Sequence, residues 1–211
     1  MQLRKSIGLY SAIIALSIGV LGVYGFQSFN LGESQTSSTN LEGSHVAGHV
    51  TMFATAADGR ITAYRQSDNL ITDQGADCVN KSLFNPTGGV TNCSGSPGTF
   101  NVIALGTGTA GTSRADSALG TETAATGLAR ATGTTNATSD SATTSSGSSK
   151  VSVQNTFTNT SGSTVTITEA GLFNSTNRSI DGMFAEEPIS PSIALNNNDA
   201  LTVKWTISLT N

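Results

Sequence analysis

The stretch LTVKWTISLT, residues 201–210, has the clearest pattern in this chain, because apolar and polar side chains alternate along its whole length. A half-buried antiparallel strand requires this period of two, since successive side chains point to opposite faces of a sheet. We therefore expect a strand that packs one face on a core and turns the other toward solvent. The predicted core face carries Leu201, Val203, Trp205, Ile207 and Leu209.

Shorter versions of this pattern occur upstream. Residues 45–55, HVAGHVTMFAT, alternate and precede Asp58-Gly59, which favours a two-residue hairpin turn, so residues 60–65 should return as a second strand. Many short strands separated by turn residues predict a mainly β chain, folded as an immunoglobulin-like or jelly-roll antiparallel sandwich. The other expected strands are at 100–105, 151–157, 165–169, and, as a short apolar run, 182–185.

Two segments interrupt the strands. Thr72 or Asp73 can cap a short helix that ends before Asn85-Pro86. Between Thr132 and Ser149, twelve of eighteen residues are Ser or Thr. We interpret this segment as a polar hairpin or long loop inside one sandwich rather than a disordered linker, because the flanking strands are too few to fold as separate domains.

The N-terminal part is of a different kind. Residues 7–26 contain no charged side chain and follow Arg4-Lys5, as in a signal peptide core or a transmembrane helix of about 20 residues. Residues 30–44 are polar and lack periodicity, which is typical of a tether. We expect three parts: a helical signal, anchor or filament-core segment at 1–29, the tether at 30–44, and a β-sandwich domain at 45–211.

Three fates are open for the apolar segment, and each places the rest of the chain outside the cell. A signal peptidase could cut after Gly25, or the segment could stay as a membrane anchor at residues 7–26. The third fate is cleavage after Ser6. A short basic leader before an unbroken apolar helix resembles the class III signal of archaeal type IV pilins, which implies that residues 7–26 become a filament-core helix.

A second resemblance covers residues 100–209. It rests on FNVIALGTGT at 100–109, RADSALGTE at 114–122, Arg130, VTITEAGLFN at 165–174 and IALNNNDALTVKWTISL at 193–209. These motifs resemble β-domains of phage and archaeal-virus appendage proteins. The resemblance implies a structural β-module of extracellular assemblies.

Composition argues against nucleic acid as a partner. Only 11% of the residues are charged, and the net charge is −4. Binding to nucleic acid depends on neutralising phosphates with basic side chains, and this acidic chain has no basic stripe.

Motifs for catalysis or cofactor binding do not stand out. The chain has no G-x-S-x-G nucleophile elbow, and the glycine-rich stretch 106–111 lacks the lysine of a phosphate loop. His45 and His49 are best interpreted as exposed strand residues. Glu169, Glu186 and Glu187 give no sign of converging as a glycosidase pair would. We expect no enzyme, no cofactor and no metal site.

Export makes two covalent modifications plausible. The two cysteines, Cys78 and Cys93, are expected to form a disulfide. Six N-x-S/T sequons are possible glycosylation sites, at Asn80, Asn92, Asn136, Asn159, Asn174 and Asn177.

The sequence therefore favours a non-catalytic, extracellular filament subunit that polymerises with itself through its N-terminal segment. Residues 7–26 could be retained and pack in a core. Alternatively, residues 26–55 could add as a strand to the sheet edge of a neighbour, a route that predicts an unfilled groove or a mobile first strand. The competing hypothesis is a membrane-anchored monomeric adhesin or binding module.

Overall fold

The structure is a computed structural model that describes residues 45–84, 99–109, 113–139, 148–179 and 182–210. The apolar segment and the tether predicted at 1–44 lie outside these residues. Residues 43–211 group as one unit, and only the described part of that unit is considered below. Within this part, no helix is both long and apolar enough to cross a membrane.

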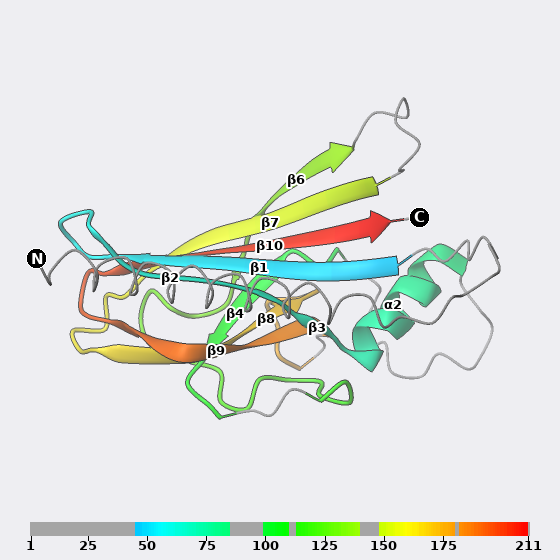
Figure 1. Ribbon diagram of the computed structural model, residues 1–211. Helices are drawn as coiled ribbons and strands as arrows, with labels where there is room; N and C mark the ends of the chain where they lie inside the picture. The colour runs from blue at the N-terminus through cyan, green and yellow to red at the C-terminus, as the bar shows by residue number, and fades with distance from the viewer. Residues whose placement is uncertain (1–44, 85–98, 110–112, 140–147, 180–181, 211) are drawn as a thin grey trace, which may run out of the picture. The chain divides into compact units, whose positions relative to one another are not determined.

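The described chain is mainly β, as the alternating patterns predict (Figure 1). Its one helix, α2 (Asp73–Phe84), lies where the sequence places it. The strands are β1 (His45–Thr55), β2 (Ile61–Asp68), β3 (Leu70–Ile71), β4 (Val102–Gly106), β5 (Ala131–Thr132), β6 (Thr134–Ser139), β7 (Ser148–Thr158), β8 (Val165–Phe173), β9 (Met183–Leu195) and β10 (Ala200–Thr210).

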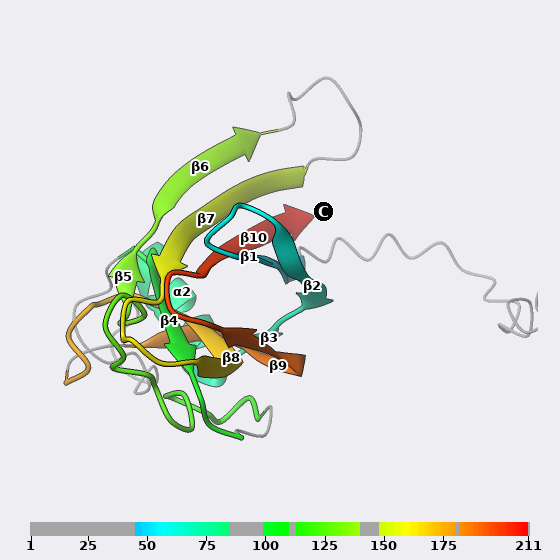
Figure 2. The same cartoon turned by 90° about the vertical axis from the view of Figure 1, so that its left-hand side faces the viewer.

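These strands form two five-stranded sheets that pack as a β-sandwich. The first sheet has the order β2-β1-β10-β7-β6, and the second has the order β3-β9-β8-β4-β5. All the pairings between these strands are antiparallel. Figure 2 shows the two sheets as separate layers.

The strand with the clearest sequence pattern lies at the centre of the first sheet. β10 pairs with β1 on one side, from His45↔Thr210 to Thr55↔Ala200, and with β7 on the other. Val203 and Trp205 are fully buried between the sheets, while Lys204 is exposed. Burial therefore confirms the predicted core face along most of β10.

The hairpin predicted at 45–65 is confirmed, but its turn is longer than two residues. The amide of Gly59 donates to the carbonyl of Ala56, and the amide of Ala56 donates to the carbonyl of Arg60. Gly59 has a φ of 85°, which favours glycine, and the ladder shifts register at Ala54/Thr55. A turn followed by a glycine in the left-handed region replaces the predicted two-residue turn.

Each edge strand of the first sheet continues directly into an edge strand of the second. Only Asn69 separates β2 from β3, and only Gly133 separates β5 from β6. Strands that switch sheets in this way join the two layers along both sides (Figure 2). The Ser/Thr-rich segment is also part of the sandwich, since β6 and β7 pair as a hairpin, which confirms that interpretation.

The sequence pattern predicts a strand that is much shorter than β9 (Met183–Leu195). The short strand expected at 182–185 is one end of a strand of thirteen residues that continues through EEPIS and a second proline. Glutamates and prolines disfavour a strand interior on propensity alone. Here tertiary contacts override propensity, because Glu186 and Glu187 are both buried.

Candidate functional site

An apolar groove lies at one end of the sandwich, where β1 begins and β10 ends. Its volume is about 390 Å³, within the range of roughly 300–1,000 Å³ that is usual for ligand pockets. Both sheets and α2 contribute side chains. The lining consists of Val46, Val79, Thr99, Phe100, Asn101, Thr135, Val151, Val153, Leu172, Phe184, Ile207 and Leu209.

Apolar side chains dominate this lining and remain partly open to solvent. Nine of the twelve lining residues are apolar, and none of these described residues is charged. Val46 is 40% exposed and Leu209 is 45% exposed, although both belong to strands whose next inward residues are buried. Figure 1 shows α2 and the end of β10 at this same end of the domain.

Exposed apolar side chains gather around the groove. The described residues expose six large hydrophobic side chains, and four of them lie in β1, β10 or α2, the elements that meet there. These four are Val46, Leu209, Leu83 and Phe84. Of these four, Val46 and Leu209 line the groove, whereas Leu83 and Phe84 lie at the end of α2.

The outer face of the second sheet differs, because residues 113–130, which we call the cover, lie over it. Leu119 of the cover is buried in a small second core with four sheet residues, Val102, Ala104, Phe173 and Met183. The motif residues RADSALGTE therefore belong to the cover rather than to a strand.

Glu169 fastens the cover to the sheet. Its carboxylate accepts hydrogen bonds from the backbone amides of Gly108 at 3.0 Å, Gly120 at 3.0 Å and Thr121 at 2.8 Å. Both oxygens of this buried carboxylate therefore have hydrogen-bond partners. The glutamate of the TEAGLF motif thus has a structural task.

Arg130 fastens the other end of the cover. Its guanidinium is almost fully buried and donates to Glu122 from Nε at 2.8 Å and to the carbonyl oxygen of Ser175 from Nη1 at 2.9 Å. It also lies 4.3 Å above the centre of the Phe173 ring. Arg178 adds a second contact to Glu122 at 3.0 Å. The sequence shows Arg130 only as a basic residue among apolar neighbours, and its partner could not be inferred.

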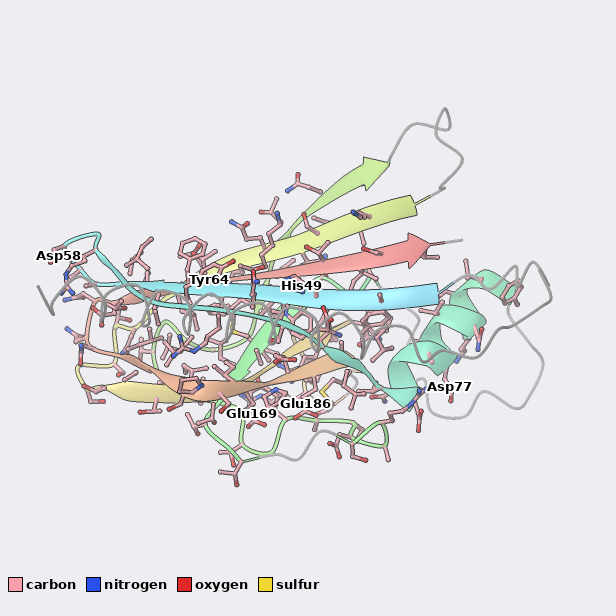
Figure 3. The ribbon with its side chains drawn as sticks, in the orientation of Figure 1. His49, Asp58, Tyr64, Asp77, Glu169 and Glu186 are labelled. Carbon is pink, nitrogen blue, oxygen red and sulfur yellow. The ribbon has the colours of Figure 1, made fainter. Side chains whose placement is uncertain are left out.

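Glu186 is the one carboxylate beneath the cover that is left unsatisfied among the described side chains. It is fully buried, and neither of its oxygens makes a hydrogen bond of normal geometry, although an interaction with the side chain of Asp116 contributes to its raised pKa. Burial, followed by the negative charges of Asp116 and Glu169, raises its pKa from 4.5 to about 7. Figure 3 labels Glu169 and Glu186 on the side of the second sheet that faces the cover.

The neighbouring Glu187 has a different environment. Its carboxylate accepts a short hydrogen bond from the hydroxyl of Ser67 on β2. Burial raises the pKa of Glu187, and the bond from Ser67 acts in the opposite direction. Glu186 and Glu187 therefore contact different elements and do not face a common cleft.

The remaining predicted residues are dispersed. His49 makes a contact of 3.0 Å with Asp68 through Nδ1, and no group of three or more potential metal ligands occurs within the described ranges. Cys78 is fully buried and disulfide-bonded. Cys93 lies outside the described residues, as do Ser6 and Gly25, so the pairing and both cleavage sites stay predictions.

The sequons differ in exposure. Asn80, Asn136 and Asn177 are exposed, and Asn174 is partly buried. Asn159 is fully buried, and its side-chain amide donates to the carbonyl oxygens of Ser163 and Leu195, each at 2.8 Å. Asn159 is therefore a structural residue of the β7–β8 turn in the folded chain, with no room for a glycan. Asn92 lies outside the described residues.

Searches of protein-family models, of curated proteins and of solved structures return no match to this chain.

Proposed function

We propose that this chain is a non-catalytic, extracellular structural subunit of a cell-surface filament, assembled through its N-terminal segment. The observation that carries the proposal is the apolar groove at the end of the sandwich where β1 begins. A domain that leaves Val46 and Leu209 open to solvent has surface to bury in an assembly.

Two further observations support the proposal. Two of the buried carboxylates serve the fold, since Glu169 holds the cover in place and Glu187 is bonded to Ser67. A disulfide at Cys78 suits an oxidising compartment and therefore an exported chain. The resemblance of residues 100–209 to appendage domains implies the same role.

We also propose that the sandwich is of the immunoglobulin-like rather than the jelly-roll type. The neighbouring strands β9-β8-β4 follow the order of the three-stranded sheet of that fold, if β1 is counted as its first strand. The first sheet departs from that fold in two ways: β10 is an additional strand between β1 and β7, and β2 lies outside β1 instead of between β1 and β7.

The test combines mass spectrometry of the native mature N-terminus with negative-stain electron microscopy of the same fraction. Filaments whose subunits begin at Ile7 are expected if the apolar segment is retained. Filaments that begin at or near Phe26 would support strand addition instead. An intact N-terminus without filaments would contradict the proposal and favour a membrane-anchored monomeric adhesin.

A further inference from the structure

We infer that the groove is filled, in the assembled filament, by the apolar segment Ile7–Phe26 of a second copy. Subunits would then join by burying side chains at the end of the sandwich, and not by adding a strand to a sheet edge. The inference rests on the filament function proposed above, and it names the partner of that groove.

The edge strands β3, β5 and β6 offer little to an added strand, whereas β2 is an edge strand of eight residues. β3 and β5 have two residues each, and each continues into the opposite sheet through a single residue. The Arg65 guanidinium on β2 donates to the carbonyl oxygen of Pro191 on β9 at 3.0 Å, so this side is also linked by a side chain. The edge of β6 has the sequence TTNATS, which provides no large apolar side chain. Strand addition requires an open edge with side-chain pockets beside it.

The chemistry of the groove selects an apolar occupant without charge. Its described lining has nine apolar residues and three neutral polar ones. A charged partner would lose hydration there without gaining an opposite charge. Residues 7–26 of this chain form a long run without Asp, Glu, Lys or Arg. The groove has room for only a few large side chains, so one face of the segment would enter it.

The position of the groove brings this segment within reach of a neighbour. Val46 lines the groove and follows the polar residues 27–44 almost directly. Those 18 residues can span up to roughly 60 Å when extended. A domain of this size has a diameter of about 40 Å. The connector is therefore long enough to carry the segment past its own domain to the groove of the next copy.

Site-specific photocrosslinking tests the identity of the occupant. A benzophenone amino acid would replace Leu209 in the full chain, and filaments would be assembled from a mixture of ¹⁵N-labelled and unlabelled copies. We expect cross-linked peptides that join position 209 to residues 7–26 and that combine labelled with unlabelled partners. The same probe at Ile61, which is exposed outside the groove, should give at least tenfold less of this product.

Each other outcome has a defined meaning. Cross-links within one copy, cross-links to residues 27–55 or 85–98, or filaments without any cross-link at 209 would overturn the inference and leave the filament function standing. Absence of filaments from the unmodified chain would overturn the filament function itself.

Matched substitutions give a second, independent readout. Leu209→Asp places a charge in the groove and should reduce filament yield at least tenfold, whereas Ile61→Asp should leave it within twofold. Circular dichroism of the monomers checks that both variants fold, and Val46→Ser replaces Leu209→Asp if that variant does not. Normal filament yield from a folded groove variant contradicts the inference.

Discussion

The covered face of the second sheet and the open end of the sandwich differ in how far their apolar side chains are buried. Both have apolar side chains that the two main sheets do not bury. At the covered face, Leu119 of the cover packs on the apolar side chains of the sheet. Glu169 and Arg130 hold the cover in place. At the open end, Val46 and Leu209 remain partly exposed. One surface is completed within the subunit, and the other is the surface that we propose a second copy to bury.

The largest test of this comparison removes Arg130, which pairs with Glu122 inside the cover and links the cover to Ser175 and Phe173. Arg130→Met should lower the free energy of unfolding by roughly 3–5 kcal/mol, because it leaves the buried Glu122 without its main partner. Arg114→Met is the control, since Arg114 pairs with Asp73 at the surface and should cost about 0–1 kcal/mol. Urea denaturation measures both. Equal losses in the two variants would mean that the cover is not held as described.

A leucine at each region provides the most direct comparison. Leu119→Ala should cost roughly 2–4 kcal/mol, because it leaves a cavity in the small second core. Leu209→Ala should cost less than about 1 kcal/mol in the monomer, because its side chain is already 45% exposed. Thermal or urea denaturation of the monomer gives both values. A large loss from Leu209→Ala would show that the groove is already packed within the subunit.

The smallest expected effect concerns the buried carboxyl of Glu186. Its pKa is about 7 in the folded chain against 4.5 ordinarily, so the folded state retains a proton that the unfolded state has lost between these values. As far as this group is concerned, stability should therefore be highest and level below about pH 4.5, fall by about 1–3 kcal/mol as the pH rises through 7, and stay level above that.

Two variants isolate that contribution. Glu186→Gln should flatten the decline and stabilise the protein at pH 8, since a neutral amide replaces a buried charge. Asp116→Asn should reduce the decline in part, because Asp116 raises the pKa of Glu186. Denaturation series at several pH values provide the measurement. A Glu186→Gln profile parallel to that of the unmodified chain would assign the pH dependence to another group, such as Glu187.

The sequence predicts the strands that have one buried and one solvent-facing side. β10, β1 and β7 follow this rule, and α2 follows from its capping residue and its terminal proline. β9 escapes prediction because the cover buries its outer side as well, so that Glu186 lies inside. Where a loop from a distant part of the sequence covers the outer face of a sheet, both faces of the strand are buried. The alternation of apolar and polar residues then no longer shows which residues are buried.

The groove could not be predicted, because its lining comes from elements that are far apart in the sequence. Val46, Val79 and Ile207, for example, meet only after both sheets and α2 have formed. The one signal of the groove in the sequence is Leu209, an apolar residue that continues the alternation of β10 almost to the last residue of the strand. The strand-addition route predicts an unfilled groove, and the groove that is present lies at the end of the sandwich where β1 begins, with Thr135 of the edge strand β6 in its lining.

The pairing of β1 with β10 has a mechanical consequence. His45 and Thr210 are partners in the ladder, so the described chain starts and finishes at the same end of the sandwich, beside the groove. In a filament built as proposed, tension would pass from the segment before His45 to the segment seated near Leu209 across a few residues only. Most of the domain would experience no pull. The tensile strength of such a filament would depend on how strongly the groove binds the inserted segment, because the rest of the domain would carry little load.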